Sequence, residues 1–243
     1  MIKKFVVYNV KICYTESMKK HFEKYGITIT DKQQELFEKY YSLLIEYNKK
    51  FNLTAITERE EVINKHFVDS SLSCGKVCGQ TLLDVGSGGG FPAIPLKIMN
   101  DNLSVTMLEA TGKKCEFLKT VVKELGLTNV TVINGRAEDI AKDERYREKF
   151  DCVTARAVAR LNTLLEYCMA FVKVGGSFVA LKGDVEVELT EAENAIKVLG
   201  GRLKESFNYE LEGAKRALIT VEKIKSTDKK YPRGNGKERK NPL

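Results

Sequence analysis

Apolar positions follow two different patterns along the chain, and the pattern changes near residue 80. Over residues 30–50 they recur at steps of three and four, which predicts an amphipathic helix, and residues 57–72 show the same period. Each segment opens on the spacing of a capping box, Thr30 with Gln33 and Thr57 with Glu60. We therefore expect an N-terminal helical cap over residues 18–78.

From residue 81, short apolar runs alternate with amphipathic stretches. The apolar runs predict strands at 81–85, 104–108, 130–133, 151–154 and 176–182. The stretches predict helices at 91–99, 113–125, 161–171 and 185–199. Two longer alternating segments, 203–211 and 216–224, predict a terminal antiparallel hairpin. This order is typical of an α/β fold with a buried parallel sheet, here five parallel-type strands plus the hairpin in a domain at 79–225.

Positive charge is concentrated at the two ends of the chain. The sequence has 40 Lys and Arg against 33 Asp and Glu, a formal charge of +7. Residues 225–243 hold seven of the basic and two of the acidic residues, and residues 1–24 hold six lysines and two glutamates. We expect residues 226–243 to form an extended basic tail that either contacts the phosphates of a polyanion or only keeps the protein soluble.

The composition excludes several classes of protein. Its 43% hydrophobic and 30% charged residues are ordinary for a globular domain. The six cysteines, at positions 13, 74, 78, 115, 152 and 168, are scattered, as reduced thiols are in a cytosolic protein. With two histidines and no paired cysteine ligands, we expect no metal site. No secretory signal, 18-residue apolar run, heptad or large apolar stripe occurs, so we expect a cytoplasmic monomer without membrane contact.

The most specific motif is LLDVGSGGGFP at residues 82–92, in which an apolar strand ends in an acid and runs into a glycine-rich turn. Glycine permits a tight backbone turn and close approach of a ligand. Gly86, Gly88 and Gly90 satisfy G-x-G-x-G, whereas the dinucleotide fingerprint G-x-G-x-x-G needs a glycine where Phe91 stands. The motif favours S-adenosylmethionine over NAD and predicts a class I methyltransferase with a Rossmann-like, seven-stranded sheet.

Residues at the ends of the next three strands support this interpretation. Glu109 ends the second strand, where a carboxylate can accept hydrogen bonds from both ribose hydroxyls. The turn RAED at 136–139 follows the third strand, where methyltransferases usually contact adenine. Arg156 ends the fourth strand and is a positioning candidate, because a guanidinium there can contact a phosphate, a base edge or the cofactor carboxylate.

The fourth strand lacks the catalytic motifs of two methyltransferase types. It has neither the Asn/Asp-Pro-Pro-aromatic motif of exocyclic-amine enzymes nor the Pro-Cys and Thr-Cys pairs of enzymes that attack cytosine, so we expect Cys152 to be a buried hydrophobe. Guanine N7 carries a lone pair and no proton, so its methylation needs alignment and desolvation more than a general base. The missing motifs fit N7 chemistry without proving it, and we assign no certain catalytic residue.

Five segments of the sequence resemble the bacterial 16S rRNA guanine-N7 methyltransferase family, also called glucose-inhibited division protein B. They are FNLTAIT at 51–57, KHFVDS at 65–70, LDVGSGGGFP at 83–92, ARAVARL at 155–161, and the ending KYPR at 230–233 with KNPL at 240–243. The match runs from about residue 18 to residue 243. The resemblance implies a class I fold and S-adenosylmethionine-dependent methylation of one guanine at N7 in 16S rRNA of the small ribosomal subunit.

The motifs and the resemblance together give a set of expected contacts. For the cofactor these are Asp84, Gly86, Ser87, Gly88, Phe91, Glu109, Ala110, Thr111, Ala137, Glu138 and Arg156. For RNA they are Lys65, His66 and Arg160 near the cofactor and Lys229, Lys230, Arg233 and Lys240 in the tail, with a purely structural role as the alternative for His66. Two departures from the family pattern, Ala93 in place of a usual glycine and Ser71 in place of a common apolar residue, are expected to have small effects.

Other interpretations stay open from the sequence alone. The same fold could act on a small molecule or a protein, or the chain could be an RNA-binding protein with a vestigial cofactor pocket. Deleting residues 226–243 is expected to weaken RNA binding and to spare cofactor binding. Residues 1–17 precede the match, so we expect them to be a loosely held extension or the product of an upstream start.

Overall fold

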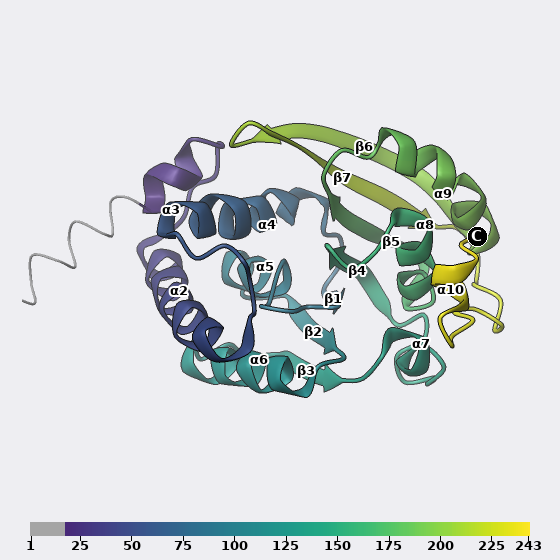
Figure 1. Ribbon diagram of the computed structural model, residues 1–243, viewed down its shortest axis with the longest axis horizontal. Coiled ribbons are helices and arrows are strands. Elements are labelled where there is room, and N and C mark those ends of the chain that lie inside the picture. Colours follow the sequence, from purple (N-terminus) through teal and green to yellow (C-terminus); the bar gives the residue numbers. More distant parts are fainter. Residues whose placement is uncertain (1–17) are drawn as a thin grey trace, which may run out of the picture.

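Seven strands form one mixed sheet at the centre of the molecule (Figure 1). The computed structural model describes residues 18–243, and the expected extension at 1–17 lies outside them. The strands are β1 (Thr81–Val85), β2 (Ser104–Glu109), β3 (Val130–Asn134), β4 (Phe150–Arg156), β5 (Val172–Lys182), β6 (Gly201–Leu211) and β7 (Ala214–Lys223), in the sheet order β3-β2-β1-β4-β5-β7-β6. Strands β1 to β5 pair in parallel, and β7 is antiparallel to β5 and β6. This arrangement confirms the predicted class I, Rossmann-like architecture.

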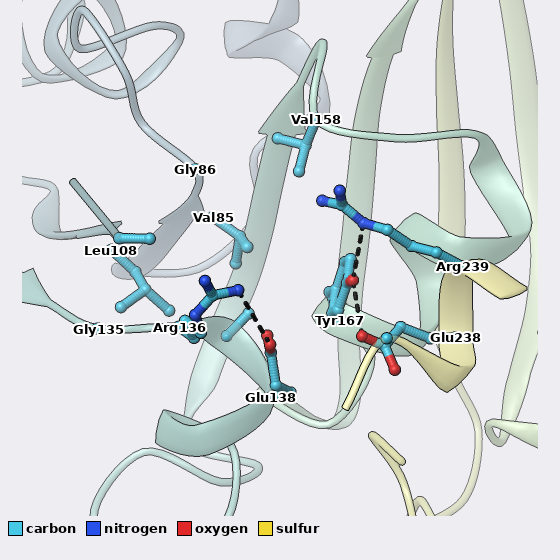
Figure 2. Close-up of a pocket in the computed structure, with 13 residues that line it drawn as sticks. Val85, Gly86, Leu108, Gly135, Arg136, Glu138, Val158, Tyr167, Glu238 and Arg239 are labelled. Carbon is cyan, nitrogen blue, oxygen red and sulfur yellow. Dashed lines mark hydrogen bonds and ion pairs between the residues drawn. The ribbon is translucent and has the colours of Figure 1, made fainter. Parts of the chain in front are cut away.

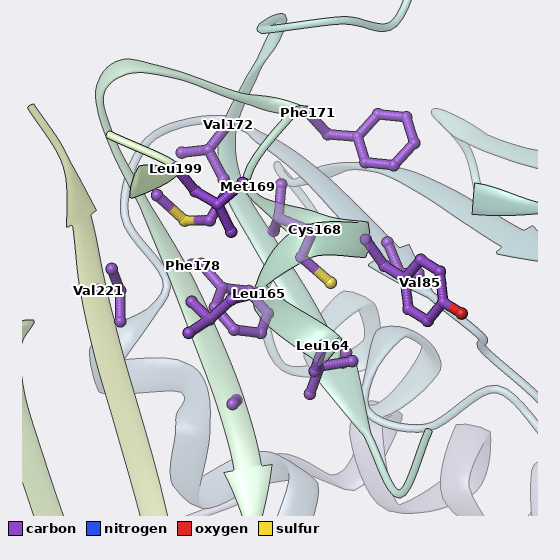
Figure 3. Packing of buried hydrophobic residues seen from close by; sticks show 14 of the residues in the cluster. Val85, Leu164, Leu165, Cys168, Met169, Phe171, Val172, Phe178, Leu199 and Val221 are labelled. Carbon is purple, nitrogen blue, oxygen red and sulfur yellow. The ribbon is translucent and has the colours of Figure 1, made fainter. Parts of the chain in front are cut away.

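The core consists of two apolar clusters, one on each face of the sheet. Successive residues of a strand point to opposite faces, and accordingly Leu83 and Val153 belong to one cluster while Leu82 and Cys152 belong to the other. Figure 3 shows the first cluster, in which side chains of α8 and the segment after it pack against Phe178 of β5. Near-continuous apolar strands are therefore required, because both faces of these strands are covered.

Helices cover both faces of the sheet. Residues of α8 (Leu161–Cys168) and α9 (Glu186–Val198) belong to the first cluster, with α7 (Ala137–Ile140) packed against it. Residues of α2 (Asp31–Phe51), α5 (Ala93–Met99) and α6 (Gly112–Glu124) belong to the second. The N-terminal helices thus share a core with the sheet. The boundary that we predict between a cap at 18–78 and a domain at 79–225 stays a prediction.

The cap contains one regular and one irregular helix. Thr30 caps α2 with the predicted capping box, and Phe37 and Tyr40 are fully buried beneath that helix. The second helix begins at α3 (Arg59–Val62), widens into the π-helical turn Ile63–Val68 and ends as α4 (Asp69–Leu72). The second predicted capping box is wrong, because Glu58 is the N-cap and no side chain in residues 18–243 caps this end. Wide π turns often occur at functional sites.

Two element boundaries differ from the prediction by three residues or more, and the others by at most two. Helix α8 ends at Cys168 rather than at 171, and β5 begins at Val172 rather than at 176. The pairing of β5 with β4 shifts register between Phe150 and Cys152, which accommodates the extra residues before Ser177 as a bulge. The apolar run at 169–172 suits both a helix end and a buried strand, so periodicity alone does not separate them.

The basic C-terminal segment is folded against the domain, which corrects the expectation of an extended tail. Tyr231 and Glu238 are buried, and residues Lys237–Lys240 form the short helix α10. Arg233 forms a two-pronged ion pair with the fully buried carboxylate of Glu166 in α8, with Nη2 2.7 Å from Oε2 and Nε 2.9 Å from Oε1. The charge count predicted a solvated segment because Glu166, the buried partner of Arg233, is far from this segment in the sequence.

Candidate cofactor and substrate site

The glycine-rich turn connects β1 to α5 at the carboxyl edge of the sheet. Gly86, Gly88 and Gly90 have φ of 74°, 56° and 96°, a region that side chains other than glycine rarely adopt. The amide of Gly86 donates to the carbonyl of Leu108 at 2.8 Å, which ties the turn to β2. The buried Tyr40 hydroxyl donates to the carbonyl of Gly89, so α2 of the cap holds the other side of the turn.

Glu109 stands at the end of β2, directly beside this turn. Its Oε2 accepts a hydrogen bond from the amide of Gly88 at 2.9 Å, and its Oε1 accepts one from the amide of Thr111 at 2.8 Å. The residue is only 7% exposed. Because each carboxylate oxygen has a second lone pair, Glu109 can still accept hydrogen bonds from a ligand while the backbone fixes its orientation.

Two connected cavities lie along the turn. The glycine-loop cavity, of about 450 Å³, is lined by Leu53, Thr54, His66, Gly86, Ser87, Gly88, Gly89, Phe91, Glu109, Ala110, Lys114, Arg156, Ala157 and Val158. The tail-side cavity, of about 260 Å³, is lined by Val85, Gly86, Leu108, Ala110, Gly135, Arg136, Ala137, Glu138, Val158, Tyr167, Gly236, Glu238 and Arg239. They share Gly86, Ala110 and Val158, so one elongated ligand can occupy both.

The C-terminal segment forms one wall of the tail-side cavity. Figure 2 shows Tyr167, Glu238 and Arg239 on one side and Leu108, Arg136 and Glu138 on the other. Glu238 Oε1 accepts a hydrogen bond from the Tyr167 hydroxyl at 2.8 Å, whereas its buried Oε2 has no partner within residues 18–243. A buried acceptor without a partner is costly, so this oxygen is available to a donor group of a ligand.

Arg156 anchors the irregular cap helix to the end of β4. Its Nη1 donates to the carbonyl of Lys65 at 3.0 Å and to Oδ2 of Asp69 at 3.2 Å, and its Nη2 lies 2.8 Å from Nδ1 of His66. The guanidinium also lies over the Phe91 ring, 4.9 Å from its centroid. Arg156 therefore joins the cap to the glycine loop, and several of its donors are already used.

His66 is held as a neutral ring. Nδ1 of His66 lies 2.8 Å from Nη2 of Arg156 and 3.0 Å from the carbonyl oxygen of Lys65. We assign the ring proton to Nε2, because the guanidinium nitrogen always donates and therefore needs the lone pair of Nδ1. Nε2 lies 2.8 Å from the Thr54 hydroxyl and can donate to it. Burial and, next in size, the charge of Arg156 together lower the pKa of His66 to about 3. His66 thus lines the site as a hydrogen-bonding group without a charge.

The neutral state of His66 can be tested by nitrogen NMR. We expect the Nε2-protonated tautomer from pH 8 down to about pH 5, with the signal assigned by its loss in His66→Gln and with His21 as the second histidine in the spectrum. Since the unfolded chain takes up this proton near pH 6.5 and the folded chain does not, the stability contributed by neutral His66 is lost as pH falls below that value. Titration of the ring near pH 6.5 in the folded protein would contradict this assignment.

Asp84 is the penultimate residue of β1, beneath the turn, and is fully buried. Its Oδ1 accepts a hydrogen bond from Thr154 at 3.0 Å, while Oδ2 has no partner in the described chain. Burial raises the pKa of Asp84 to about 7, so the carboxyl is partly protonated at neutral pH. Its position indicates a role in supporting the turn from below.

The structure brings together most of the residues expected from the sequence. Nine of the expected cofactor residues line the two cavities: Gly86, Ser87, Gly88, Phe91, Glu109, Ala110, Ala137, Glu138 and Arg156. Among the described residues, Asp84 and Thr111 line neither cavity, although the amide of Thr111 orients Glu109. That these residues contact the cofactor stays a prediction.

The expected RNA residues fall into separate groups. Lys65 and His66 border a third cavity, which is described below, whereas Arg160 is half-exposed and pairs with Glu191. Exposed tail residues are Lys229, Lys230 and Lys240. Arg233 differs from them because its guanidinium is committed to Glu166, so the structure gives it a packing role instead of the expected free charge.

Sequence reasoning missed site residues that come from distant elements. They include Tyr40, Lys114, Val158, Tyr167, Glu238 and Arg239. Val158 could have been found from its place just after the fourth strand, since ligands bind at the carboxyl ends of parallel strands. Tyr40 and Glu238 carried no such signal, because a buried helix tyrosine and an acid in a basic segment are both ordinary.

The fold and the turn define a class I S-adenosylmethionine-dependent methyltransferase. Solved structures with the same fold include a SAM-dependent methyltransferase from Aquifex aeolicus (TM-score 0.53, 16% identity, 74% of this chain and 97% of that one). Another is M. jannaschii TYW2 in complex with AdoMet (TM-score 0.53, 17% identity, 70% of this chain and 80% of that one).

Sequence comparison identifies the family. The model of the family rRNA small subunit methyltransferase G matches residues 33–225. Relatives named ribosomal RNA small subunit methyltransferase G include proteins from Brevibacillus brevis (49% identity, 90% of this chain and 94% of that one) and Pelotomaculum thermopropionicum (48% identity, 94% and 98%). The chain belongs to the rRNA small subunit methyltransferase G family, as the sequence resemblance implied.

The part of the chain that the structure describes has no helix that is both long and apolar enough to cross a membrane. It also has no group of three or more His, Cys, Asp or Glu side chains placed to hold a metal ion.

Proposed function

We propose that the protein transfers the methyl group of S-adenosylmethionine to N7 of one specific guanine in 16S rRNA of the small ribosomal subunit. The observation that carries the proposal is a positively charged cavity directly beside the glycine-loop cavity, with Arg156, His66 and Ala157 in the wall between them. An RNA nucleotide is the polyanionic substrate that such a cavity attracts. The relatives named ribosomal RNA small subunit methyltransferase G support the same substrate.

The residues of the two cavities fit this cofactor. The glycine-loop cavity offers Glu109 as an acceptor for ribose hydroxyls, and the space above Gly88 is open, with no atom of the described chain nearer to an added Cβ than the carbonyl of Gly86 at 3.8 Å. In the tail-side cavity, Glu138 and the unpartnered Glu238 oxygen are acceptors for an adenine amine. When bound, the cofactor supplies an electrophilic methyl group on a sulfonium.

The protein's own contribution to the reaction is to align the methyl group with the guanine. Guanine N7 loses no proton on methylation, so the site needs no strong base there. His66 has both ring nitrogens engaged in hydrogen bonds, and Asp84 is buried below the turn, which fits a reaction without general-base catalysis. Phe91, Tyr40 and Arg156 form a packed wall that fixes the relative positions of cap and loop.

A methylation assay tests the proposal. The full chain is incubated with S-adenosylmethionine labelled in the methyl group and with either deproteinised 16S rRNA or assembled small subunits, followed by nucleoside analysis. We expect label in 7-methylguanosine from at least one of the two substrates, and none from RNA carrying 7-deazaguanine at the target position. Absence of label from both RNA substrates would overturn the proposal, and transfer to a protein or a small molecule would favour another substrate class.

We propose in addition that the enzyme acts in the cytoplasm as a monomer. The substrate is ribosomal RNA, and the described residues include only five large hydrophobic side chains that are exposed: Val174, Val187, Leu203, Phe207 and Ile224. Sedimentation of the pure protein at working concentration measures the oligomeric state, and a stable dimer would contradict this part of the proposal.

A further inference from the structure

A third cavity opens beside the glycine-loop cavity and is strongly basic. This basic cavity, of about 250 Å³, is lined by Ile56, Lys65, His66, Asp69, Arg156, Ala157, Leu181, Lys182, Gly183 and Arg216. The lining residues come from the irregular cap helix, the ends of β4 and β5, and β7. It therefore lies at the carboxyl edge of the sheet, where substrates of open α/β folds bind.

Three of the four cations in this cavity are already paired. Lys65 pairs with Glu61, and Arg156 pairs with Asp69. Lys182 lies 2.8 Å from Glu188 and also donates to the carbonyl of Ala159. With His66 neutral, four cations face three carboxylates, and the unbalanced positive charge belongs to Arg216.

Arg216 has no full partner in the described chain. Its Nε is buried and makes no hydrogen bond with any residue in 18–243, and its ion pair with Oδ1 of Asp69 spans 4.0 Å. That oxygen already accepts a hydrogen bond from the Tyr209 hydroxyl at 2.7 Å, and Oδ2 of the same carboxylate accepts from Arg156. A guanidinium whose nearby carboxylate is used by two stronger donors retains donors for a ligand.

The position of Arg216 is set by the pairing of the two strands beneath it. Lys182 is opposite Ala217 in the antiparallel pair of β5 and β7, so Arg216 extends past the end of β5 toward Gly183. A Cβ on Gly183 would lie 3.9 Å from Nη1 of Arg216, which shows how close the guanidinium comes to that turn. The side chain is 29% exposed, so an anion can reach it from solvent.

We propose that the basic cavity holds the target nucleotide of the RNA and that Arg216 binds a phosphate of that nucleotide. The inference rests on the proposed function and adds to it a specific recognition residue. A phosphate is favoured over a base edge because the cavity carries an unbalanced charge, and the planar guanidinium binds a phosphate with two parallel hydrogen bonds. The apolar residues of the cavity are Ile56, Ala157 and Leu181. They can contact the base, which would then lie beside the wall shared with the glycine-loop cavity.

The experiment compares two variants that remove the same charge from neighbouring positions of β7. Arg216→Ala removes the proposed phosphate ligand, whereas Lys215→Ala removes an exposed lysine that pairs with Asp184 and does not line the basic cavity. For each, the KM for the RNA substrate, the Kd for S-adenosylmethionine, the thermal midpoint and the dependence of RNA affinity on salt are measured. Arg216→Lys, which keeps the charge, is the rescue variant.

We expect Arg216→Ala to raise the KM for RNA about tenfold or more and to lower the salt slope of RNA binding by about 0.7 to 0.9. The Kd for the cofactor stays at the wild-type value, and Arg216→Lys restores the slope. An unchanged slope for Arg216→Ala, or an equal change in Lys215→Ala, would overturn the inference. If the wild-type enzyme itself transfers no methyl group to RNA, the proposed function fails first, so the two failures are distinguishable.

Discussion

Gly88→Leu is expected to weaken binding of S-adenosylmethionine about 100-fold while the protein stays folded. A Cβ at this position meets no atom of the described chain within 3.4 Å, so the new side chain occupies the glycine-loop cavity instead of clashing with the fold. The positive φ of 56° costs about 1–2 kcal/mol in local strain. Overfilling the ligand space costs about 3 kcal/mol of binding free energy. This corresponds to a loss of cofactor affinity of about 100-fold, which titration calorimetry measures.

A matched control separates loss of the ligand space from backbone strain. Gly126 also has a positive φ, 64°, with nothing within 4 Å of an added Cβ, and it lies in the turn after α6, outside the lining of the cavities. Gly126→Leu should therefore lose stability by a similar amount and bind the cofactor normally. Gly86→Leu is the poorer probe, because its Cβ would lie 2.7 Å from Val158 and could disturb folding. Wild-type affinity in Gly88→Leu would remove the glycine loop from the cofactor site.

The elements that position the loop could be predicted because their signals are local. The strand before Gly86 is a short apolar run interrupted only by Asp84 near its end, and the turn glycines need a positive φ wherever the rest of the chain lies. Thr30 and Gln33 are three residues apart, so their mutual capping is also a local property. The position of Glu109 could be predicted as well, since it ends the neighbouring parallel strand and ligands bind at the carboxyl ends of such strands.

The basic cavity could not be predicted in the same way. Arg216 comes from the antiparallel strand β7, and Asp69 comes from the cap helix that the π turn reshapes. Their proximity depends on the register of β5 with β7 and on the docking of the cap by Arg156. Neither the register nor the docking can be inferred from residues that are close together in the sequence. The resemblance indicated Lys65 and His66, but nothing in the sequence indicated Arg216.

The C-terminal segment shows a different limit of sequence reasoning. Seven basic residues in 225–243 suggested a solvated tail, yet Glu166 and Arg233 are 67 positions apart and meet in the core. A single buried carboxylate is enough to convert a charged segment into a packed one, because it must be paired. The same segment carries Gly236, Glu238 and Arg239 into the tail-side cavity, so its deletion is now expected to weaken cofactor binding as well as RNA binding.

Arg233→Ala is expected to destabilise the folded protein strongly and to loosen the tail-side cavity. The substitution leaves the fully buried Glu166 with only the backbone amide of residue 233, at 2.8 Å, as its hydrogen-bond donor from this segment. Breaking a buried pair costs about 3–5 kcal/mol, and because Arg233 is 24% exposed we expect about 3 kcal/mol here. For a chain of this size the thermal midpoint falls by about 6–12 °C, and the affinity for S-adenosylmethionine decreases.

Lys230→Ala is the matched control, because it removes one positive charge from the same segment at a side chain that is 64% exposed. Lys230 forms an ion pair with the exposed Asp228, and its Nζ lies 5.2 Å from the centroid of the Tyr231 ring. Its melting temperature should stay within about 1 °C of the wild-type value, since exposed pairs contribute about 0–1 kcal/mol. The double variant Glu166→Gln with Arg233→Ala removes the orphaned charge and should recover part of the stability lost in Arg233→Ala. Equal melting temperatures for Arg233→Ala and Lys230→Ala would show that the segment is held by its apolar contacts, such as Tyr231, and that the ion pair does not anchor it.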